Sequence, residues 1–486
     1  MTSPVQLGLQ NTFAEQLQGL YVPWAPEGFA QPALIHYNDA LHVELGLPSE
    51  AKTHAAALFS GSMAPADSVP LCQAYAGHQF GGFSPQLGDG RAVLLGEVAT
   101  PDGRLMDIQL KGSGRTPFSR GGDGFASVGP ILREALLSEA MFHLGVPTTR
   151  VLAASRTGEA VYRATPLPGA VLARTASSHI RVGTLQFFAA RRDSERLGTL
   201  VNFALARHAP HRVGRENPSF ELLMHTAEVQ AELIAAWMRI GFVHGVMNTD
   251  NTTISGETID YGPCAFLDVY DPKTVFSSID HGARYAFGNQ PGIGQWNLAR
   301  AGEALLDLLD PDPDTAVERV HQALEHFGTT FATAQLAGAR AKLGIPQSAS
   351  ATPDDEAEDE ALMADLLAWM HANHSDYTQT FRRLAQSLIQ DDPPRGLPPA
   401  PWLQRWRTRT GDPAQTAVAM NRANPVYIPR NHKVEEALNA AIEGDLAPFQ
   451  RMWDVVTSPF DERPEFTEFA GPAPADSAPY QTFCGT

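Results

Sequence analysis

The sequence predicts an α+β protein in which a small, mainly antiparallel β lobe is followed by a larger helical lobe. Two observations predict this division. Between residues 75 and 185, glycine-rich turns separate short apolar runs, a pattern typical of antiparallel strands. From residue 219 onward, apolar residues recur every three or four positions, as in amphipathic helices. We also expect one helix inside the β lobe and an extension after the helical lobe.

Length and composition indicate a globular protein. The chain has 486 residues, of which 43% are hydrophobic and 19% are charged, as in ordinary folded domains. A formal net charge of −18 argues against nucleic-acid binding through an overall basic surface. No run approaches the ~18 apolar residues of a membrane span, and the first residues lack a signal-peptide pattern. We therefore expect a cytoplasmic monomer that binds neither membranes nor nucleic acid.

Four parts can be distinguished along the chain. Residues 1–70 form an N-terminal lead-in, with a helix at 40–46 that ends at a glycine. We expect residues 71–185 to form the β lobe and residues 186–455 the helical lobe; the motifs described below make the first the expected nucleotide-binding lobe and place the expected catalytic and metal loops in the second. Residues 456–486 are rich in proline, alanine and acidic residues, so we expect an extended tail.

The β lobe begins with a glycine-dense loop. Glycines between 77 and 90 precede strands predicted at 92–98 and 105–111, which a turn at 101–103 joins into a hairpin. Glycine permits positive φ and close backbone approach, which phosphate-binding loops use. Turns and bulges use glycine too, so this loop alone does not establish a nucleotide site.

A lysine and a helix follow the hairpin. Lys111 ends the second strand, and the helix predicted at 131–144 starts after Pro130 and carries Glu134 and Glu139 as acidic candidates. In protein kinases, a strand lysine that binds phosphate is held by a helix glutamate. The alternatives are a solvated strand end and a solvated helix face.

The lobe continues with strands predicted at 149–155, 160–163 and 170–174, with a turn at 157–159 between the first two. Arg174 and Arg181 stand seven residues apart at the junction between the last strand and a helical segment. Arginine is common on surfaces, but two arginines in a glycine-rich lobe are credible phosphate ligands.

The helical lobe contains the clearest helix, at 219–241, which ends at Gly241. It leads directly into the segment His244–Asn251. We expect further helices at 296–309, 314–343, 357–371, 377–389, 400–407 and 433–453.

The chain is organised around the segment HGVMNTDN at 244–251 and the following DYG at 260–262. A carboxylate, an amide and a second carboxylate in this order suit Mg²⁺, which prefers oxygen ligands. The spacing is that of a kinase catalytic loop followed by its metal-binding Asp, except that Val246 occupies the position of the catalytic Asp. Because valine cannot accept a proton, γ-phosphoryl transfer is less favoured. The whole ordered set predicts a two-lobed, protein-kinase-like fold.

Six blocks strongly resemble the selenoprotein O family, and together they extend through nearly the whole chain. These blocks are YAGHQFGG at 75–82, QLGDGR at 86–91, QLKGSGRTPFSR at 109–120, HGVMNTDN at 244–251, DYGP at 260–263 and NPVYIPRN at 424–431.

The resemblance implies a protein-kinase-like fold that binds ATP in a reversed orientation. Such a protein transfers AMP to Ser, Thr or Tyr hydroxyls of protein substrates and releases pyrophosphate; UMP transfer with Mn²⁺ is also attributed to members. Reversal accounts for Val246, because a base for attack on the α-phosphorus need not occupy the kinase position.

The resemblance also implies roles for individual residues. Asp250 is the expected general base, and Asn251 and Asp260 are the expected ligands of Mg²⁺ or Mn²⁺. Lys111 is expected to contact phosphate and to pair with Glu134. Asp260 is also expected to contact the nucleotide. The other expected nucleotide contacts are Gly88, Gly90, Arg91, Asp123, Gly124, Arg174 and Arg181. This set suits charge neutralisation on phosphates and proton removal from a hydroxyl.

Two alternatives to AMP transfer remain open. A kinase that transfers the γ-phosphate would need a base in place of Val246, and a catalytically silent pseudokinase scaffold would not need the full residue set.

The three cysteines, at 72, 264 and 484, are too few for a disulfide framework. Cys484 matches the family's terminal selenocysteine, but residues 276–278 offer no partner cysteine, so it is either a neutral tail residue or a reactive thiol.

Overall fold

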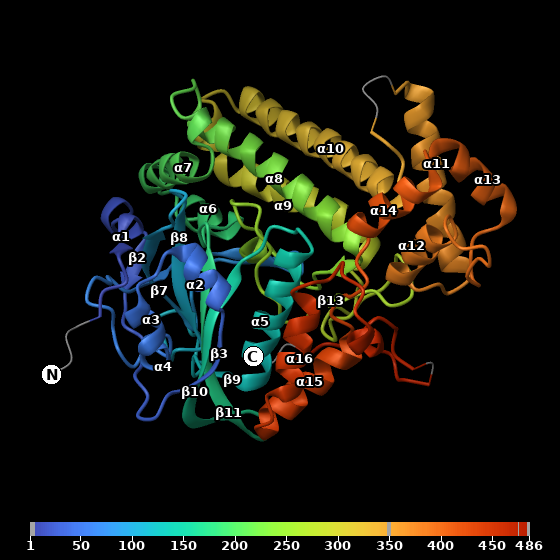
Figure 1. Cartoon of the computed structure of the whole chain (residues 1–486). Coiled ribbons are helices and arrows are strands. Elements are labelled where there is room, and N and C mark those ends of the chain that lie inside the picture. Colours follow the sequence, from blue (N-terminus) through green and yellow to red (C-terminus); the bar gives the residue numbers. More distant parts are fainter. Residues whose placement is uncertain (1–4, 348–350, 475, 484–486) are drawn as a thin grey trace.

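The computed structural model describes residues 5–347, 351–474 and 476–483. It has the predicted α+β class: an antiparallel sheet occupies one part of the molecule, and long helices lie together beside it (Figure 1). Within the described ranges, no helix is long and apolar enough to cross a membrane.

The main sheet contains nine of the described strands, paired antiparallel in the order β2-β4-β7-β8-β11-β10-β3, with β1 on β7 and β9 on β11. The predicted hairpin is confirmed, because β7 and β8 pair from Ala92 opposite Lys111 to Ala99 opposite Leu105. On its other side, β8 pairs with β11, which places Leu172 opposite Lys111. Lys111 is therefore held between two strands. The strands are β1 (Leu9–Gln10), β2 (Tyr21–Pro23), β3 (Ala33–Tyr37), β4 (Leu71–Gln73), β7 (Ala92–Ala99), β8 (Leu105–Lys111), β9 (Ala126–Ser127), β10 (Arg150–Tyr162) and β11 (Pro166–Ala176).

The residues before 71 are built into this sheet. They supply β1, β2 and β3, and β3 pairs with β10 so that His36 lies opposite Ala154. The helix predicted at 40–46 is α2 (Asp39–Leu45), which the side chain of Asn38 caps and which ends at Gly46 in the left-handed region. Three further short helices complete this part: α1 (Thr12–Gln16), α3 (Ser49–Thr53) and α4 (Ala55–Leu58).

One predicted strand boundary is wrong. The turn expected at 157–159 is absent, and β10 runs continuously from Arg150 to Tyr162. Its pairing with β11 shifts register between Arg156 and Ala160, so the glycine at 158 accommodates an irregularity within one long strand rather than a turn between two.

Helix α5 (Val128–His143) confirms the helix predicted inside the β lobe. It packs against β10 and β11 on one side and against the C-terminal helices α15 and α16 on another. Nearly all of it is buried, including Arg133, Glu134 and Glu139. Buried charges need partners, and the partner of Glu134 belongs to the site described below.

Helix α8 (Pro218–Ile240) is the predicted helix at 219–241. The side chain of Asn217 accepts a hydrogen bond from the N–H of Phe220, and Gly241 ends the helix with φ = 73°. The chain then enters β12 (Phe242–Val243), which pairs with β13 (Ala265–Phe266). This two-stranded pairing closes the base of the loop that carries residues 244–264.

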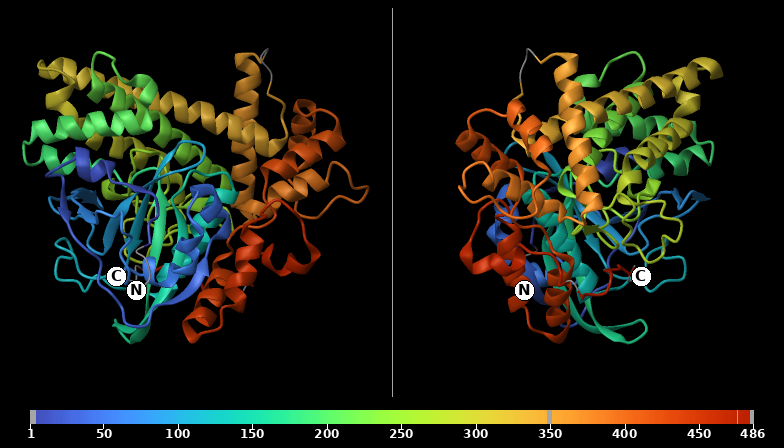
Figure 2. Two further views of the ribbon diagram at one scale, coloured as in Figure 1. Left: turned by 60° about the vertical axis from the view of Figure 1, so that its left-hand side comes forward. Right: turned by 90° about the vertical axis from the view of Figure 1, so that its right-hand side faces the viewer.

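Three more helices, α7 (Ser194–His208), α9 (Gln290–Leu309) and α10 (Pro313–Leu343), pack against α8, while α6 (Val182–Ala189) packs on α9 and α7. Figure 1 and both views of Figure 2 show α8, α9 and α10 as one layer of long helices. The helices expected at 296–309 and 314–343 are confirmed, and α7 was not predicted.

A group of helices lies beyond the end of α10, coloured orange in Figures 1 and 2. It comprises α11 (Pro353–Ala372), α12 (Tyr377–Gln386), α13 (Ala400–Arg409) and α14 (Pro413–Ala423), of which α14 was not predicted. The single helix expected at 433–453 is wrong: Gly444, with φ = 106°, separates α15 (Asn431–Glu443) from α16 (Ala447–Val456).

The C-terminal segment is only partly extended. Residues Pro464–Phe469 form a 3₁₀ helix, η4, and Phe466 and Phe469 are buried in the main hydrophobic core. Farther on, the N–H of Thr482 donates to the carbonyl of Phe276, and the N–H of Ser278 donates to the carbonyl of Thr482. Cys484 lies outside the described residues.

Candidate active site

A pocket of about 300 Å³ lies between the glycine-rich turns of the sheet and the loop that follows α8. This volume is at the small end of the range for ligand pockets. The structure brings together all of the residues expected to bind nucleotide or metal or to act as the base. These are Gly88, Gly90, Arg91, Lys111, Asp123, Gly124, Arg174, Arg181, Asp250, Asn251 and Asp260.

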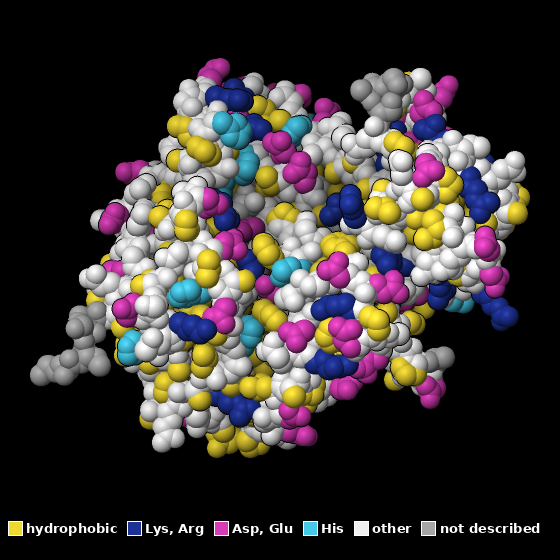
Figure 3. Space-filling model, viewed as in Figure 1, with side chains coloured by type: hydrophobic (Ala, Val, Ile, Leu, Met, Phe, Trp, Pro, Cys, Tyr) yellow, Lys and Arg dark blue, Asp and Glu magenta, His cyan; other side chains and the backbone are white. Residues whose placement is uncertain are grey.

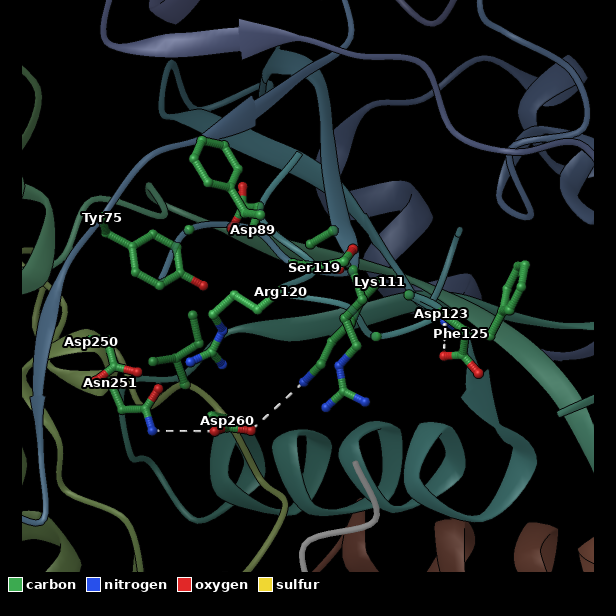
Figure 4. A pocket seen from close by; sticks show the side chains of 18 of the residues that line it. Tyr75, Asp89, Lys111, Ser119, Arg120, Asp123, Phe125, Asp250, Asn251 and Asp260 are labelled. Atoms are coloured by element: carbon green, nitrogen blue, oxygen red, sulfur yellow. Dashed lines mark hydrogen bonds and ion pairs between the residues drawn. The ribbon is translucent and has the colours of Figure 1, made fainter. Parts of the chain in front are cut away.

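Figure 4 shows how the pocket is laid out. Asp250 and Asn251 lie on one side, and Asp123 and Phe125 lie on the opposite side. Lys111 and Asp260 lie between these two groups, with dashed lines joining Asn251 to Asp260 and Asp260 to Lys111. Carboxylates from the helical part of the chain therefore face cations from the sheet.

Two loop glycines are required by close packing. Gly88 has φ = 80°, and a Cβ on it would collide with the ring of Phe118. Gly124 has φ = 75°, and a Cβ there would collide with the backbone carbonyl of Gly114. Hydrogen bonds from Thr116 Oγ1 to the carbonyl of Asp89 (2.7 Å) and from the Ser119 hydroxyl to the carbonyl of Gly90 (2.5 Å) hold the two loops together. The rim of the pocket is thus a pair of interlocked turns.

Lys111 and Glu134 form the pair expected from the sequence. Lys111 Nζ lies 2.5 Å from Glu134 Oε2 and 3.7 Å from Asp260 Oδ1. Arg174 Nη1 lies 3.3 Å from the other oxygen of Glu134. Burial raises the pKa of Glu134, but the charges of Lys111 and Arg174 outweigh it and leave the pKa below its ordinary value.

Glu139, the other acidic candidate on α5, points elsewhere. Its carboxylate accepts hydrogen bonds from Arg150 Nε (3.1 Å) and Nη2 (2.8 Å), and one from Asn38. Burial opposes ionisation, but the contacts with His143 and Arg150 lower the pKa of Glu139 to about 2. Glu139 is therefore a structural ion-pair residue outside the pocket.

The two arginines are buried and face the pocket. Arg174 donates two hydrogen bonds to Gln109 Oε1, at 2.9 and 2.7 Å. The Arg181 guanidinium stacks 4.2 Å from the centre of the Tyr75 ring and donates to the backbone carbonyl of Asp250. Among the described residues, Arg181 Nη2 has no hydrogen-bond partner and lies 3.8 Å from Asp89 Oδ1. Fixed cations with unused donors suit a phosphorylated ligand.

Asp260 is held in a strained conformation with φ = 68°. The ring of His244 hydrogen-bonds to the carbonyl of the preceding Ile259 at 2.9 Å, which fixes this loop to the one at 244–251. Burial raises the pKa of Asp260, but the charges of Lys111 and Arg91 outweigh it and lower the pKa to about 2. Asp260 is therefore ionised at neutral pH.

Asn251 joins Asp260 to the loop of residue 246. Its side-chain N–H group donates to Asp260 Oδ2 at 3.2 Å and to the carbonyl of Val246 at 3.1 Å. The Val246 side chain itself is buried and offers no polar group. Val246 takes part in the site through its backbone carbonyl, which accepts the hydrogen bond from Asn251 and so holds the loop in place.

Asp250 is a nearly buried carboxylate with one unused oxygen. Its Oδ2 accepts a hydrogen bond from Gln79 Nε2 at 3.1 Å, whereas Oδ1 has no partner among the described residues. Burial raises the pKa of Asp250 to about 6, although the hydrogen bond from Gln79 and the charge of Arg181 act in the opposite direction. A carboxylate whose pKa lies near neutrality can exchange a proton with a hydroxyl group.

The donor set fits a hard divalent cation. Asp260 supplies an ionised carboxylate and Asn251 an amide beside it, and Mg²⁺ and Mn²⁺ favour such oxygen ligands. Across the described ranges, no group of three or more His, Cys, Asp or Glu side chains could hold a metal alone. The residues therefore fit a cation that completes its coordination with phosphate oxygens and water.

Further pocket residues were not singled out from the sequence. Asp123 pairs with one of them, Arg163, at 2.7 Å. Several lie inside the sequence blocks at 75–82, 86–91 and 109–120, which is the signal that could have found them. The additional lining residues are Tyr75, Asp89, Ala92, Phe118, Ser119, Arg120, Gly122, Phe125, Arg163 and Ile259.

Interlocked glycine turns, a buried Lys–Glu pair, two arginines and adjacent carboxylates define a pocket suited to a phosphorylated ligand, as in proteins that bind nucleotides. Residues 4–457 match the family described as "Protein adenylyltransferase SelO". The chain belongs to this family of protein adenylyltransferases.

Curated relatives match over nearly their whole length. "Protein nucleotidyltransferase YdiU" of Cereibacter sphaeroides (strain ATCC 17023) is 53% identical over 486 residues, covering 98% of this chain and 99% of that protein. The protein of the same name from Rhizobium etli (strain CFN 42) is 50% identical over 490 residues, covering 98% and 97%. The one from Rhizobium rhizogenes (strain K84) is 51% identical over 493 residues, covering 98% and 96%.

Proposed function

We propose that this protein transfers AMP from ATP to Ser, Thr or Tyr hydroxyls of protein substrates and releases pyrophosphate. The observation that carries the proposal is the Asp250 carboxylate. It is nearly buried, burial raises its pKa to about 6, and its Oδ1 has no partner among the described residues. Arg181 donates to the backbone carbonyl of Asp250, and the adjacent Asn251 donates to Asp260. Membership in a family of protein adenylyltransferases supports the choice of AMP and of protein acceptors.

The nucleotide is bound by the residues of the sheet. The turns at Gly88–Gly90 and Asp123–Gly124 provide a close-packed rim for it. Lys111, Arg174 and Arg181, with Arg91 at the edge, neutralise its phosphates, and Glu134 holds Lys111 in place. Fixed cations around a pocket stabilise the charge that develops on transferred phosphates without reorganisation during the reaction.

Asn251 and Asp260 would hold Mg²⁺ or Mn²⁺. When bound, the cation supplies Lewis-acid charge neutralisation to the phosphates. The ionised state of Asp260 supports this role.

The reaction is a substitution at the α-phosphorus in which Asp250 acts as the general base. Asp250 accepts the proton of the acceptor hydroxyl as its oxygen forms a bond to the α-phosphorus of ATP. The bond between the α-phosphorus and the oxygen bridging to the β-phosphorus breaks, and pyrophosphate leaves with that oxygen. One of the two Asp250 carboxylate oxygens takes the hydroxyl proton: Oδ2 accepts a hydrogen bond from Gln79, whereas Oδ1 has no partner among the described residues and is enclosed beside Gly77.

Val246 supports transfer from the α-phosphorus rather than the γ-phosphorus. The position at which a kinase carries its base is here apolar and buried, and the ionisable carboxylate stands four residues later. A base displaced along the loop suits an acceptor that approaches a nucleotide bound in the reverse orientation.

The deciding experiment compares ATP labelled at the α-phosphate with ATP labelled at the γ-phosphate, in the presence of Mg²⁺ or Mn²⁺ and protein acceptors. We expect label on protein only from the α-position. Label only from the γ-position would identify a kinase, and no label from either would identify a pseudokinase scaffold. Substitution of UTP for ATP tests UMP transfer by the same assay.

We further propose that the chain has a two-lobed, protein-kinase-like arrangement. Its parts are a lead-in at 1–70, a nucleotide-binding lobe at 71–185, a helical lobe at 186–455 and a C-terminal segment at 456–486. The position of the pocket between the sheet and the loop after α8 supports this division. We propose that the functional unit is a monomer.

A further inference from the structure

Consecutive residues of a small hairpin form hydrogen bonds with the proposed catalytic loop. The hairpin consists of β5 (Gly77–Gln79) and β6 (Gly82–Ser84), which lie outside the main sheet. The N–H of His78 donates to Thr249 Oγ1 at 2.7 Å, and Gln79 Nε2 donates to Asp250 Oδ2 at 3.1 Å. The next N–H, that of Phe80, donates to Asn248 Oδ1 at 3.2 Å. The position of the hairpin is therefore fixed relative to the proposed base, although the two segments are about 170 residues apart.

The tip of this hairpin presents aromatic side chains to solvent. Phe80 and Phe83 are 39% and 43% exposed. Phe80 has φ = 51°, a conformation that bulky residues rarely adopt, and its N–H also donates to the Tyr285 hydroxyl oxygen, which helps to hold it. An exposed aromatic residue held in an unfavourable backbone conformation points to a function at the tip rather than to a loose turn.

The aromatic surface continues onto helix α9. The His78 ring lies 4.9 Å from the Phe83 ring and 5.3 Å from the Trp296 ring, measured between ring centres. The guanidinium of Arg284 lies 4.6 Å from the centre of the Trp296 ring. It also lies beside the tip, because a Cβ on Gly81 would be 3.8 Å from it.

Three arginines lie beside this surface, and one of them, Arg300, lies 5.0 Å from the centre of the Trp296 ring and pairs with Glu303. Arg284 makes no ion pair with any described residue. Nor does Arg191, whose guanidinium stacks 3.4 Å from the centre of the Phe187 ring and donates to the carbonyl of Pro85, just after β6. Over the face shown in Figure 3, acidic and basic side chains are interspersed. In a chain with a net charge of −18, Arg191 and Arg284 thus place positive charge without acidic partners next to exposed aromatic residues.

We propose that Phe80, Phe83, Arg191, Arg284 and Trp296, here named the acceptor platform, bind the acceptor segment of the protein substrate. This inference rests on the proposed function. The platform is continuous with the site, because the hairpin that carries Phe80 and Phe83 contacts the Asp250 carboxylate through Gln79. Its unpaired arginines complement acidic residues, and its aromatics complement apolar ones. The favoured acceptor is therefore an extended segment with Asp or Glu and an apolar residue near the modified hydroxyl.

The test uses the full-length protein, ATP labelled at the α-phosphate and synthetic peptides. Each peptide carries one Ser, Thr or Tyr flanked by acidic, basic or neutral residues. The variants are Phe80→Ser/Phe83→Ser and Arg284→Glu. Matched controls are Ile389→Ser, an exposed apolar residue after α12, and Arg407→Glu, an exposed arginine on α13 without an ion pair among the described residues. ATP affinity is measured for every variant by calorimetry, because the platform does not line the nucleotide pocket.

We expect the unchanged protein to prefer acidic over basic flanks by about fivefold in kcat/KM, a size typical of exposed charge pairs. Arg284→Glu should reverse that preference. Loss of both phenylalanines should raise KM for the peptides by roughly tenfold, given their apolar area, and leave ATP affinity unchanged. Both controls should behave as the unchanged protein does.

Three results would overturn the inference. Unchanged flank preference and KM in both platform variants would remove the platform from acceptor binding. A shift from dimer to monomer in the Phe80→Ser/Phe83→Ser protein, with unchanged KM, would show that a second copy of the chain covers this surface. Failure of the unchanged protein to label any peptide or protein from the α-position would instead reject the proposed function, and the inference with it.

Discussion

Replacement of Glu134 with glutamine tests whether Lys111 is held in place for phosphate binding. The carboxylate lies 2.5 Å from Lys111 Nζ and 3.3 Å from Arg174 Nη1, and its side chain is only 5% exposed. Glutamine has nearly the same size, so the variant removes charge without opening a cavity. Two buried cations then lose the carboxylate that they share.

The expected size of the effect follows from burial. Removing one partner of a buried ion pair costs about 3–5 kcal/mol. An unfolding entropy of ~2.1 cal/mol/K per residue amounts to ~1 kcal/mol/K for this chain, so Tm should fall by about 3–5 °C if the protein unfolds as one unit.

The stability effect depends on pH with a defined sign. The pKa of Glu134 is below its ordinary value of 4.5 in the folded protein. Its contribution to stability is therefore present above about pH 4.5 and is lost as the pH falls through the folded pKa. The difference in unfolding free energy between the two proteins should shrink in acid.

The assay compares Glu134→Gln with Glu139→Gln, a change five residues farther along the same helix. Glu139 is also buried and is paired with Arg150, but it lies outside the pocket. Both variants should lose similar stability in denaturant titrations. Only Glu134→Gln should lose AMP transfer, by about a hundredfold in kcat/KM, because Lys111 is no longer positioned at the phosphates. Equal transfer rates in the two variants would refute the assigned role of the pair.

Four further outcomes are expected. Asp250→Asn should abolish AMP transfer but retain ATP binding by calorimetry; transfer at the unchanged rate would exclude Asp250 as the base. Removal of divalent cations with EDTA should stop transfer, and added Mg²⁺ or Mn²⁺ should restore it; activity that persists in EDTA would contradict the metal role of Asn251 and Asp260. Gly88→Ala should weaken ATP binding by at least about tenfold, because the methyl group collides with a buried ring; unchanged affinity would show that the loop can move. Burial raises the pKa of Glu257 to about 7, so its folded form favours the protonated state and loses stability as pH rises through 7. Glu257→Gln should therefore gain up to ~2 kcal/mol over the unchanged protein between pH 5 and pH 8, and a constant difference would contradict the shift.

Much of the fold was predictable because its signals are local. Helix α8 has a capping asparagine before it, a proline in its first turn and a glycine after it, and these residues define its ends within one or two positions. The hairpin β7–β8 is similarly defined by its turn at 101–103. Local signals failed at Gly158, where the pairing of β10 with β11 over a long stretch overrides the tendency of glycine to form a turn.

The list of site residues was also available from the sequence, through the resemblance of contiguous blocks. Glycines, a lysine, arginines and carboxylates in a fixed order identify the residue types that a nucleotide and a metal require, without any knowledge of distances. The eleven residues named on this basis for nucleotide, metal or base all line the pocket, beside ten that were not named, and their roles are proposals.

The partners of those residues were decided only by the tertiary structure. Glu134 and Glu139 are the same residue type on the same helix, so the sequence does not distinguish them. Only the packing of α5 turns Glu134 toward Lys111 and Glu139 toward Arg150. Gln79 contacts Asp250 across 171 positions of sequence. Local patterns cannot encode such contacts, because these depend on how separate elements pack and on which buried charges then find partners. The sequence thus determined which chemical groups the site contains, and the tertiary structure determined which of them face one another.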